Sequence, residues 1–101
     1  MQQILERLAA ANIQLLPITA IENHFVFERD GFIALVERTK ENGFGKVGSA
    51  GLLTERGMAV LISRGERNLF VAKGFELEAT PDQVRVMRRF DVDLRAALGT
   101  A

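Results

Sequence analysis

Two apolar runs separated by Asp30-Gly31 form the clearest hydrophobic pattern in the chain. Residues 24–36 read HFVFERDGFIALV. Asp-Gly between apolar runs is typical of a two-residue β-hairpin turn, because both turn positions favour positive φ. Counting outward from this turn places His24 opposite Glu37. The sequence therefore predicts an antiparallel hairpin at this point.

This register gives the hairpin two apolar faces, because opposed residues in a sheet point to the same side. One face is apolar along its whole length and carries Phe25, Phe27, Phe32, Ala34 and Val36. The other face carries Val26, Ile33 and Leu35 at its centre and His24, Glu28 and Glu37 at its ends. A hairpin that is apolar on both sides needs cover on both sides, from a helix, a curled sheet or a second subunit.

Shorter apolar runs on both sides of this hairpin predict the other strands of a meander. Residues 13–21 form a strand that Pro17 interrupts, since proline lacks the ladder donor and favours a sheet edge or a bend. Turn residues around Glu55-Arg56-Gly57 and at residues 64–67 predict two more hairpins, and a last strand follows Gly74. Hairpin connections in series make sequence neighbours spatial neighbours in the sheet.

Helical periodicity occurs at both ends of the chain. Residues 1–12 place their apolar side chains on one narrow stripe, so this short helix must dock on another element or serve as a dimerising arm. Residues 80–83, Thr-Pro-Asp-Gln, combine a helix N-cap, a proline at the first helical position and a capping box. The helix that starts there is expected to run to Leu98, with Gly99 just past its end. Its core side is expected to hold Val84, Met87, Phe90, Leu94, Ala97 and Leu98.

These elements predict one α+β domain over residues 1–101. Its architecture is an antiparallel meander sheet of five to six strands, flanked by an N-terminal and a C-terminal helix. A chain of this length can bury a single core. The two helices share one face of the sheet, or one of them closes the open end of a curled sheet; the pattern leaves both arrangements open.

The charge balance bears on which partners the protein binds. Lysine plus arginine and aspartate plus glutamate number 13 each, so the net charge is zero. Non-specific nucleic-acid binding depends on neutralised phosphates, so we expect no nucleic-acid partner. Zero net charge also leaves self-association electrostatically unopposed. We therefore expect the partner to be a second copy of the chain or another protein.

The composition also limits the chemistry and the location that we expect. Cysteine is absent, which excludes disulfides, thiolate catalysis and cysteine-based zinc sites. The N-terminal segment is too charged for a signal peptide, and no apolar run approaches the ~18 residues of a spanning helix. We accordingly expect a cytoplasmic protein with no membrane partner and no cofactor.

A glycine-rich segment is the first candidate for a ligand site. Residues 43–48, GFGKVG, match the pattern GxGxxG, whose glycines elsewhere let backbone amides approach phosphates. The dinucleotide-binding version needs a parallel βαβ unit, whereas an apparent β-hairpin follows here. Two interpretations stay open: a flexible loop without a ligand, or an anion-contacting loop with Lys46 as a point charge. The candidate ligand contacts are Gly43, Gly45, Lys46 and Gly48.

The single histidine, His24, is the second candidate, because the predicted register places it opposite Glu37. A carboxylate beside a histidine orients it for acid–base chemistry. No nucleophile or set of oxyanion donors accompanies the pair, so we assign no catalytic residue, and one histidine does not make a usual metal site. The pair is interpreted either as a structural cross-strand contact or as part of the ligand site.

The outer side of the predicted C-terminal helix is basic. It carries Arg85, Arg88, Arg89 and Arg95. Such a face is either solvated or meets phosphates or an acidic partner, and no aromatic residues are interleaved for stacking on bases. Val92 is apolar where water is expected, which suggests contact with another chain.

These patterns favour a small non-enzymatic interaction module that self-associates as a homodimer. The hypothesis rests on the hairpin that is apolar on both faces, the zero net charge and the narrow stripe of the N-terminal helix. The alternative is a small-ligand-binding domain that uses the loop of residues 43–51 as its lid. An enzyme that acts through His24 and Glu37 is a third hypothesis, with only two of the needed roles filled.

Overall fold

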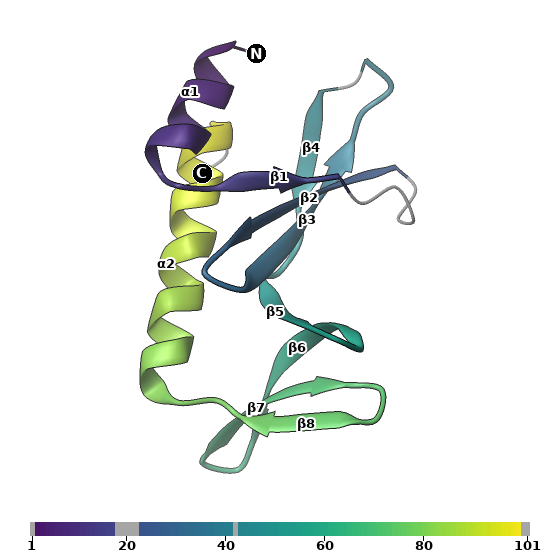
Figure 1. The fold of residues 1–101 in the computed structure, drawn as a ribbon, viewed down its shortest axis with the longest axis vertical. Coiled ribbons are helices and arrows are strands. Elements are labelled where there is room, and N and C mark those ends of the chain that lie inside the picture. The colour runs from purple at the N-terminus through teal and green to yellow at the C-terminus, as the bar shows by residue number, and fades with distance from the viewer. Residues whose placement is uncertain (1, 18–22, 42, 100–101) are drawn as a thin grey trace.

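The computed structural model describes residues 2–17, 23–41 and 43–99. In chain order the elements are α1 (Gln2–Ala10), β1 (Gln14–Leu16), β2 (His24–Arg29), β3 (Phe32–Arg38), β4 (Phe44–Val47), β5 (Gly51–Thr54), β6 (Gly57–Arg64), β7 (Arg67–Ala72), β8 (Phe75–Glu78) and α2 (Pro81–Leu98). The strands form an antiparallel sheet, and α1 packs against α2 on one side of it (Figure 1). This arrangement confirms the predicted α+β class, with a meander flanked by two terminal helices.

The sheet has eight strands in the described part of the chain, more than the five to six expected. The unexpected strand is β4, which lies in the glycine-rich segment, so the prediction of a loop is wrong for residues 44–47. Tertiary packing overrides the weak strand propensity of this segment. The rings of Phe44 and Phe25 pack with their centroids 5.0 Å apart, and Val47 is buried in the core.

Two predicted elements are shorter than expected. The helix predicted over residues 1–12 is α1, and residue 1 lies outside the described residues. The strand predicted over residues 13–21 is β1, which ends at Leu16, next to Pro17. Residues 18–21 of that prediction also lie outside the described residues.

β3 pairs with two strands along the same edge, and this divides the sheet. β4 pairs with the C-terminal end of β3 through Val36↔Val47, and β5 pairs with the N-terminal end through Ile33↔Gly51. Residues 48–50 connect β4 to β5 outside the ladder. The strands β1–β4 and β5–β8 therefore form two halves that meet at β3, with α2 running along both (Figure 1).

The β2–β3 hairpin has the predicted register throughout. Its pairs run from Arg29↔Phe32 at the turn to His24↔Glu37 at the open end. Asp30 and Gly31 have φ angles of 55° and 86°. Both values lie in the left-handed region that this kind of two-residue turn requires, so the local Asp-Gly signal determines the pairing.

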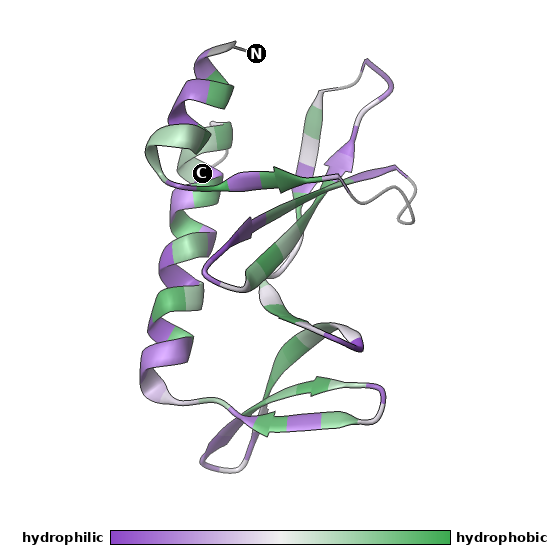
Figure 2. Cartoon of the chain, viewed as in Figure 1, coloured by the Kyte–Doolittle hydropathy of each residue, from purple (hydrophilic) through white to green (hydrophobic). Residues whose placement is uncertain are grey.

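α2 packs its apolar side on the sheet and begins and ends as predicted. The Gln83 amide donates to Thr80 Oγ1 at 3.1 Å, and the Thr80 amide donates to Gln83 Oε1 at 2.9 Å, which makes the capping box. Gly99, with φ of 79°, follows the last turn. Apolar residues recur along α2 and along both halves of the sheet (Figure 2). The buried residues of α2 are the predicted set: Val84, Met87, Phe90, Leu94, Ala97 and Leu98.

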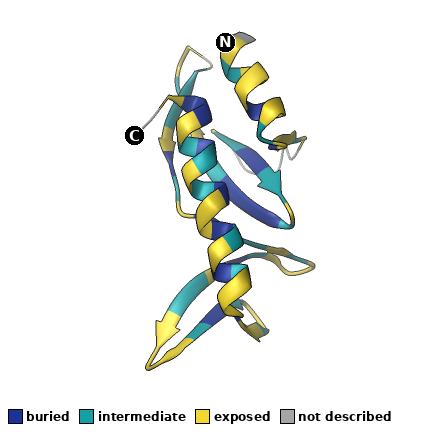
Figure 3. Cartoon of the chain, turned by 90° about the vertical axis from the view of Figure 1, so that its left-hand side faces the viewer, coloured by how far each residue is buried: buried dark blue, intermediate teal, exposed yellow. Residues whose placement is uncertain are grey.

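α1 is docked on α2 and does not extend as an arm. Leu8 is buried in the core, and Arg7 Nε donates to the Ala97 carbonyl oxygen at 2.9 Å. Figure 3 views α2 from outside and shows α1 beside its C-terminal part. The docking of α1 agrees with the interpretation of this helix as cover for the core, because a helix of this length needs tertiary contacts to be stable.

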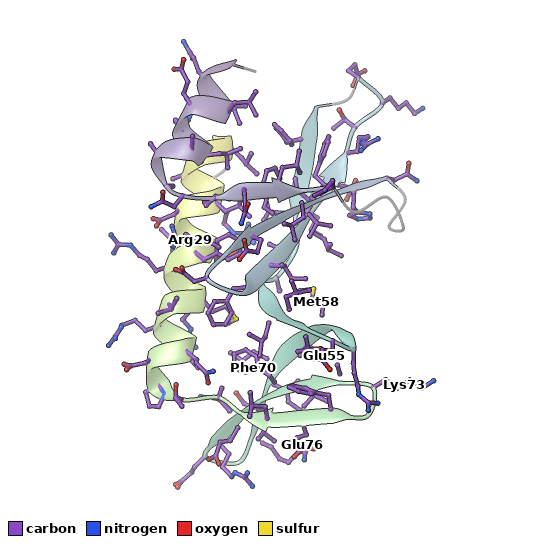
Figure 4. The ribbon with its side chains drawn as sticks, viewed as in Figure 1. Arg29, Glu55, Met58, Phe70, Lys73 and Glu76 are labelled. Carbon is purple, nitrogen blue, oxygen red and sulfur yellow. The ribbon has the colours of Figure 1, made fainter. Side chains whose placement is uncertain are left out.

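Arg29, at the end of β2, connects three parts of the molecule. Its Nη1 donates to Asp93 Oδ2 of α2 at 2.9 Å and to the Ala11 carbonyl oxygen after α1 at 3.0 Å. Its guanidinium carbon lies 5.7 Å from the centre of the Phe90 ring. Only 12% of the side chain is exposed. Arg29 therefore fixes the tip of the β2–β3 hairpin to both helices (Figure 4).

Gly51 is expected to tolerate no side chain without loss of stability. A Cβ at this position would lie 2.5 Å from the Ala59 carbonyl oxygen and 2.8 Å from Met58 Cε. Because the carbonyl belongs to the β5–β6 ladder, Gly51→Ala should lower the free energy of unfolding by about 1–3 kcal/mol. Urea denaturation measures this loss.

Gly48→Ala is the matched control for that substitution. A Cβ on Gly48 would lie 3.3 Å from the Leu35 carbonyl oxygen, a contact that a small shift relieves. We expect a smaller loss of stability than in Gly51→Ala. Equal losses in the two variants would contradict the close approach at Gly51.

Candidate interaction surface

The register of β5, β6 and β7 assigns their side chains to two faces of the sheet. The pairs Leu52↔Ala59 and Leu61↔Phe70 belong to the core beneath α2. Figure 4 shows Phe70 pointing towards that helix. Because alternate residues point to opposite faces, the intervening pairs point away from α2. We call the surface that they form the outer sheet face: Leu53, Met58, Val60, Ile62 and Val71. Leu69 points to the same side but is buried.

In the half formed by β1–β4, the same face of the sheet is also apolar. Val26 and Ile33 are buried, although neither belongs to the core beneath α2. Ile33 pairs with Gly51, and the Met58 side chain lies over that glycine. Met58 is seen between the two halves of the sheet in Figure 4. The second face of the β2–β3 hairpin is therefore buried at its centre, as the sequence predicts.

Leu53 and Val60 form the exposed part of the outer sheet face. Their exposed fractions are 42% and 48%. Met58, Ile62 and Val71, which share the face, are half-buried. The solvated face of an antiparallel sheet is normally polar. Contiguous apolar surface on a small protein marks a site of interaction, whereas single exposed apolar residues are common.

Charged side chains of both signs border this apolar surface. Glu76 pairs with Val71 in the β7–β8 ladder and therefore lies on the same face. Its Oε1 is 3.5 Å from Nη1 of Arg64, which follows Ile62 on the same side of β6. Exposed ion pairs of this kind contribute little to stability, so their charges remain available for contacts with a second surface.

Sequence reasoning did not single out Leu53 and Val60. The signal was present in residues 58–62, MAVLI, because a strand that is apolar at consecutive positions is apolar on both faces. What the sequence did not show is which of the two faces α2 covers. That choice depends on how β5 pairs with β3, far from these residues in the chain.

The glycine-rich segment forms part of the sheet. The Gly43 amide donates to Thr39 Oγ1 at 2.9 Å, and the Gly48 amide donates to the Leu35 carbonyl oxygen at 2.9 Å. A Cβ on Gly45 would lie 3.2 Å from the Glu37 carbonyl oxygen, so glycine permits the close approach of β4 to β3. Lys46 is exposed. Ligand binding by these residues remains a prediction, and two of the amides already have partners within the protein.

His24 and Glu37 are cross-strand neighbours in the β2–β3 ladder, as predicted. His24 is half-buried and Glu37 is exposed. The approach of Gly45 to Glu37 brings the glycine-rich segment to the same end of the sheet. The structure thus gathers the predicted ligand contacts from three strands, and a role for His24 and Glu37 in binding remains a prediction.

Val92, Arg85, Arg88 and Arg89 lie on the outside of the helix. The prediction is wrong for Arg95, whose side chain is 34% exposed and donates from Nη2 to the Val47 carbonyl oxygen of β4 at 3.3 Å. Val92 is 60% exposed, so an apolar side chain lies on the solvent side of α2, as the sequence pattern predicts. Arg85 pairs with Asp82 at 2.8 Å, and Arg89 lies 3.7 Å from Asp93. The described ion pairs leave Arg88 without an acidic partner.

Two further observations concern metal and membrane sites. In residues 2–17, 23–41 and 43–99, no three histidine, aspartate or glutamate side chains gather in a way that could hold a metal ion. Neither described helix is long and apolar enough to cross a membrane.

No protein-family model matches the chain, and no curated protein or solved structure is significantly similar to it.

Proposed function

We propose that this protein is a small non-enzymatic interaction module that self-associates through its outer sheet face. The observation that carries the proposal is the exposure of Leu53 and Val60 beside the half-buried Met58, Ile62 and Val71. Burying these side chains against a second apolar surface is favourable by roughly 25 cal/mol for each Å² removed from water. A second sheet face of the same composition supplies that surface.

The charge of the chain supports a second copy as the partner. Two molecules with 13 basic and 13 acidic residues each have no net repulsion. In a two-fold dimer the same patch serves both partners, so an apolar centre bordered by both Arg64 and Glu76 can be complementary to itself. The geometry supports this function better than a ligand lid, because the Gly43 and Gly48 amides donate within the protein.

The variant Leu53→Glu tests this proposal. A carboxylate on the exposed part of the outer sheet face would be desolvated in the dimer, so we expect the dissociation constant to rise by about tenfold or more, or about 1.4 kcal/mol. Sedimentation equilibrium of the variant and of the unmodified protein measures the change.

Leu77→Glu is the matched control. Leu77 is 41% exposed, close to the 42% of Leu53, but it pairs with Phe70 and so lies on the other face of the sheet. We expect its dissociation constant to match that of the unmodified protein. Equal weakening in both variants, with unchanged circular dichroism, would contradict association through the outer sheet face.

A further inference from the structure

The outer sheet face has an acidic border and a basic border that run at right angles to each other. Glu76 and Glu78 lie on the same side of β8, the last strand of the sheet, so the acidic border runs along a strand (Figure 4). Arg64 and Arg67 are paired across β6 and β7 next to their turn, so the basic border runs across the strands. The apolar side chains of the face lie between the two borders.

The two borders have similar dimensions. Arg64 and Arg67 are cross-strand neighbours about 5 Å apart. Glu76 and Glu78 lie about 7 Å apart along β8. Glu76 is two strands from Val60, or about 10 Å, and Arg64 is four residues from Val60 along β6, or about 13 Å. Because arginine side chains are long enough to cover these differences, exchanging the two directions brings one border over the other.

This arrangement of charge distinguishes between the two ways in which sheets pack face to face. The strands of the two sheets are either roughly aligned or nearly perpendicular. In an aligned two-fold dimer centred on the apolar side chains, an axis along the strands places basic border over basic border, and an axis across the strands places acidic border over acidic border. In a perpendicular dimer the axis is diagonal, so each basic border faces an acidic border. Facing like charges are unfavourable in an interface, so the charges favour the perpendicular dimer.

The apolar residues of the face have the same diagonal symmetry. The β5–β6 ladder makes Leu53 and Val60 diagonal neighbours. A diagonal axis passes through both, so each contacts its own counterpart in the second copy. Ile62 lies beside Val60 along β6 and Val71 lies beside it across the ladder, so the axis brings Ile62 of one copy over Val71 of the other. The exposed side chains of the face, Leu53 and Val60, are thereby buried in one interface.

The charged side chains of the borders are only weakly paired within one chain. Arg64 Nη1 lies 3.5 Å from Glu76 Oε1, and Arg67 Nη2 lies 3.5 Å from Glu78 Oε2. All four side chains are more than half exposed. Because exposed ion pairs contribute little to stability, contacts with a second copy can replace or extend these pairs at little cost.

We propose that two copies of the chain stack their outer sheet faces with the strands nearly perpendicular. Arg64 of each copy then faces Glu76 of the other, and Arg67 faces Glu78, around an apolar centre at Val60. The two-fold symmetry makes each of these contacts twice. The inference rests on the proposed function, to which it adds the orientation of the second copy.

Crosslinking of single-cysteine variants tests this orientation in the full chain, which has no cysteine of its own. Arg64→Cys and Glu76→Cys are mixed in equal amounts at a concentration that populates the dimer, and a short bismaleimide joins nearby thiols. One variant is ¹⁵N-labelled, so the mass of each product shows which copies are joined. Crosslinking depends on the effective concentration of the two thiols, so the mixed product should exceed each product of identical copies by about tenfold or more.

Arg85→Cys is the matched control for these variants. The Arg85 side chain is 75% exposed, but it lies on α2, on the opposite side of the sheet from the outer sheet face. It should form a mixed product with neither Arg64→Cys nor Glu76→Cys.

The products also separate failure of this inference from failure of the proposed function. Predominant crosslinking of Arg64→Cys to itself would indicate an axis along the strands, and that of Glu76→Cys to itself an axis across them. Either result would overturn the perpendicular orientation and leave self-association through the outer sheet face intact. A dimer in sedimentation that gives none of these products would overturn both, because the copies would then associate through another surface, and a monomer at every concentration would also overturn both.

Discussion

Replacing Phe90 by alanine is expected to lower the free energy of unfolding by about 3–5 kcal/mol. Phe90 is wholly buried at the middle of α2, where it packs in the core and beneath the guanidinium of Arg29. The substitution removes an aromatic ring and leaves a cavity that the sheet and two helices close only in part. Urea denaturation followed by circular dichroism, at fixed protein concentration, measures the loss.

Val92→Ala is the control for Phe90→Ala in the same helix. Val92 is 60% exposed, so its loss should change the free energy of unfolding by no more than about 0.5 kcal/mol. If Phe90→Ala changed the free energy of unfolding as little as Val92→Ala, this result would contradict the packing of α2 on the sheet. A small domain has a free energy of unfolding of only about 5–15 kcal/mol, so the loss predicted for Phe90→Ala is a large fraction of the total.

Replacing Arg29 by methionine is expected to lower the free energy of unfolding by about 3 kcal/mol. Methionine keeps an unbranched apolar stem beside Phe90 but removes the hydrogen bonds that Arg29 donates to Asp93 Oδ2 and to the Ala11 carbonyl oxygen. The loss is costly, because water and the exposed Arg89, which lies 3.7 Å from Asp93 Oδ1, replace these contacts only in part. The same denaturation experiment measures this loss.

Arg89→Met is the matched control for Arg29→Met. Arg89 reaches the same carboxylate, but its distance to Asp93 is 3.7 Å and its side chain is 78% exposed. An exposed pair contributes about 0–1 kcal/mol, so this variant should stay close to the unmodified protein. An equal decrease in the free energy of unfolding in Arg29→Met and Arg89→Met would contradict the role of Arg29 in connecting the β2–β3 hairpin to the helices.

The parts of the fold that follow from local signals were predictable from the sequence. Asp30-Gly31 determines a turn with two positive φ angles, and the whole β2–β3 register follows by counting. Thr80 and Gly99 mark the ends of α2, because cap residues satisfy backbone groups that the helix itself leaves unpaired. These signals act over a few residues, so a single sequence suffices to show them.

Other features depend on contacts between residues far apart in the chain. Arg29 and Asp93 are 64 positions apart, and nothing near either residue indicates the other. β4 forms because Phe44 and Val47 find apolar neighbours on β2 and β3, which overrides the propensity of the glycines around them. Tertiary contacts of this kind cannot be deduced from local propensity.

The candidate sites were predictable only in part. The apolar run of residues 58–62 indicates a strand apolar on both faces, but the identity of the uncovered face follows from where β5 joins β3.

Sedimentation velocity of the unmodified protein across a dilution series tests self-association most directly. We expect a species of twice the chain mass of 11.2 kDa at high concentration. This dimer should dissociate on dilution, and Leu53→Glu should raise its dissociation constant. A single species of 11.2 kDa over the whole dilution series, including concentrations high enough to populate a weak dimer, would contradict the proposed function.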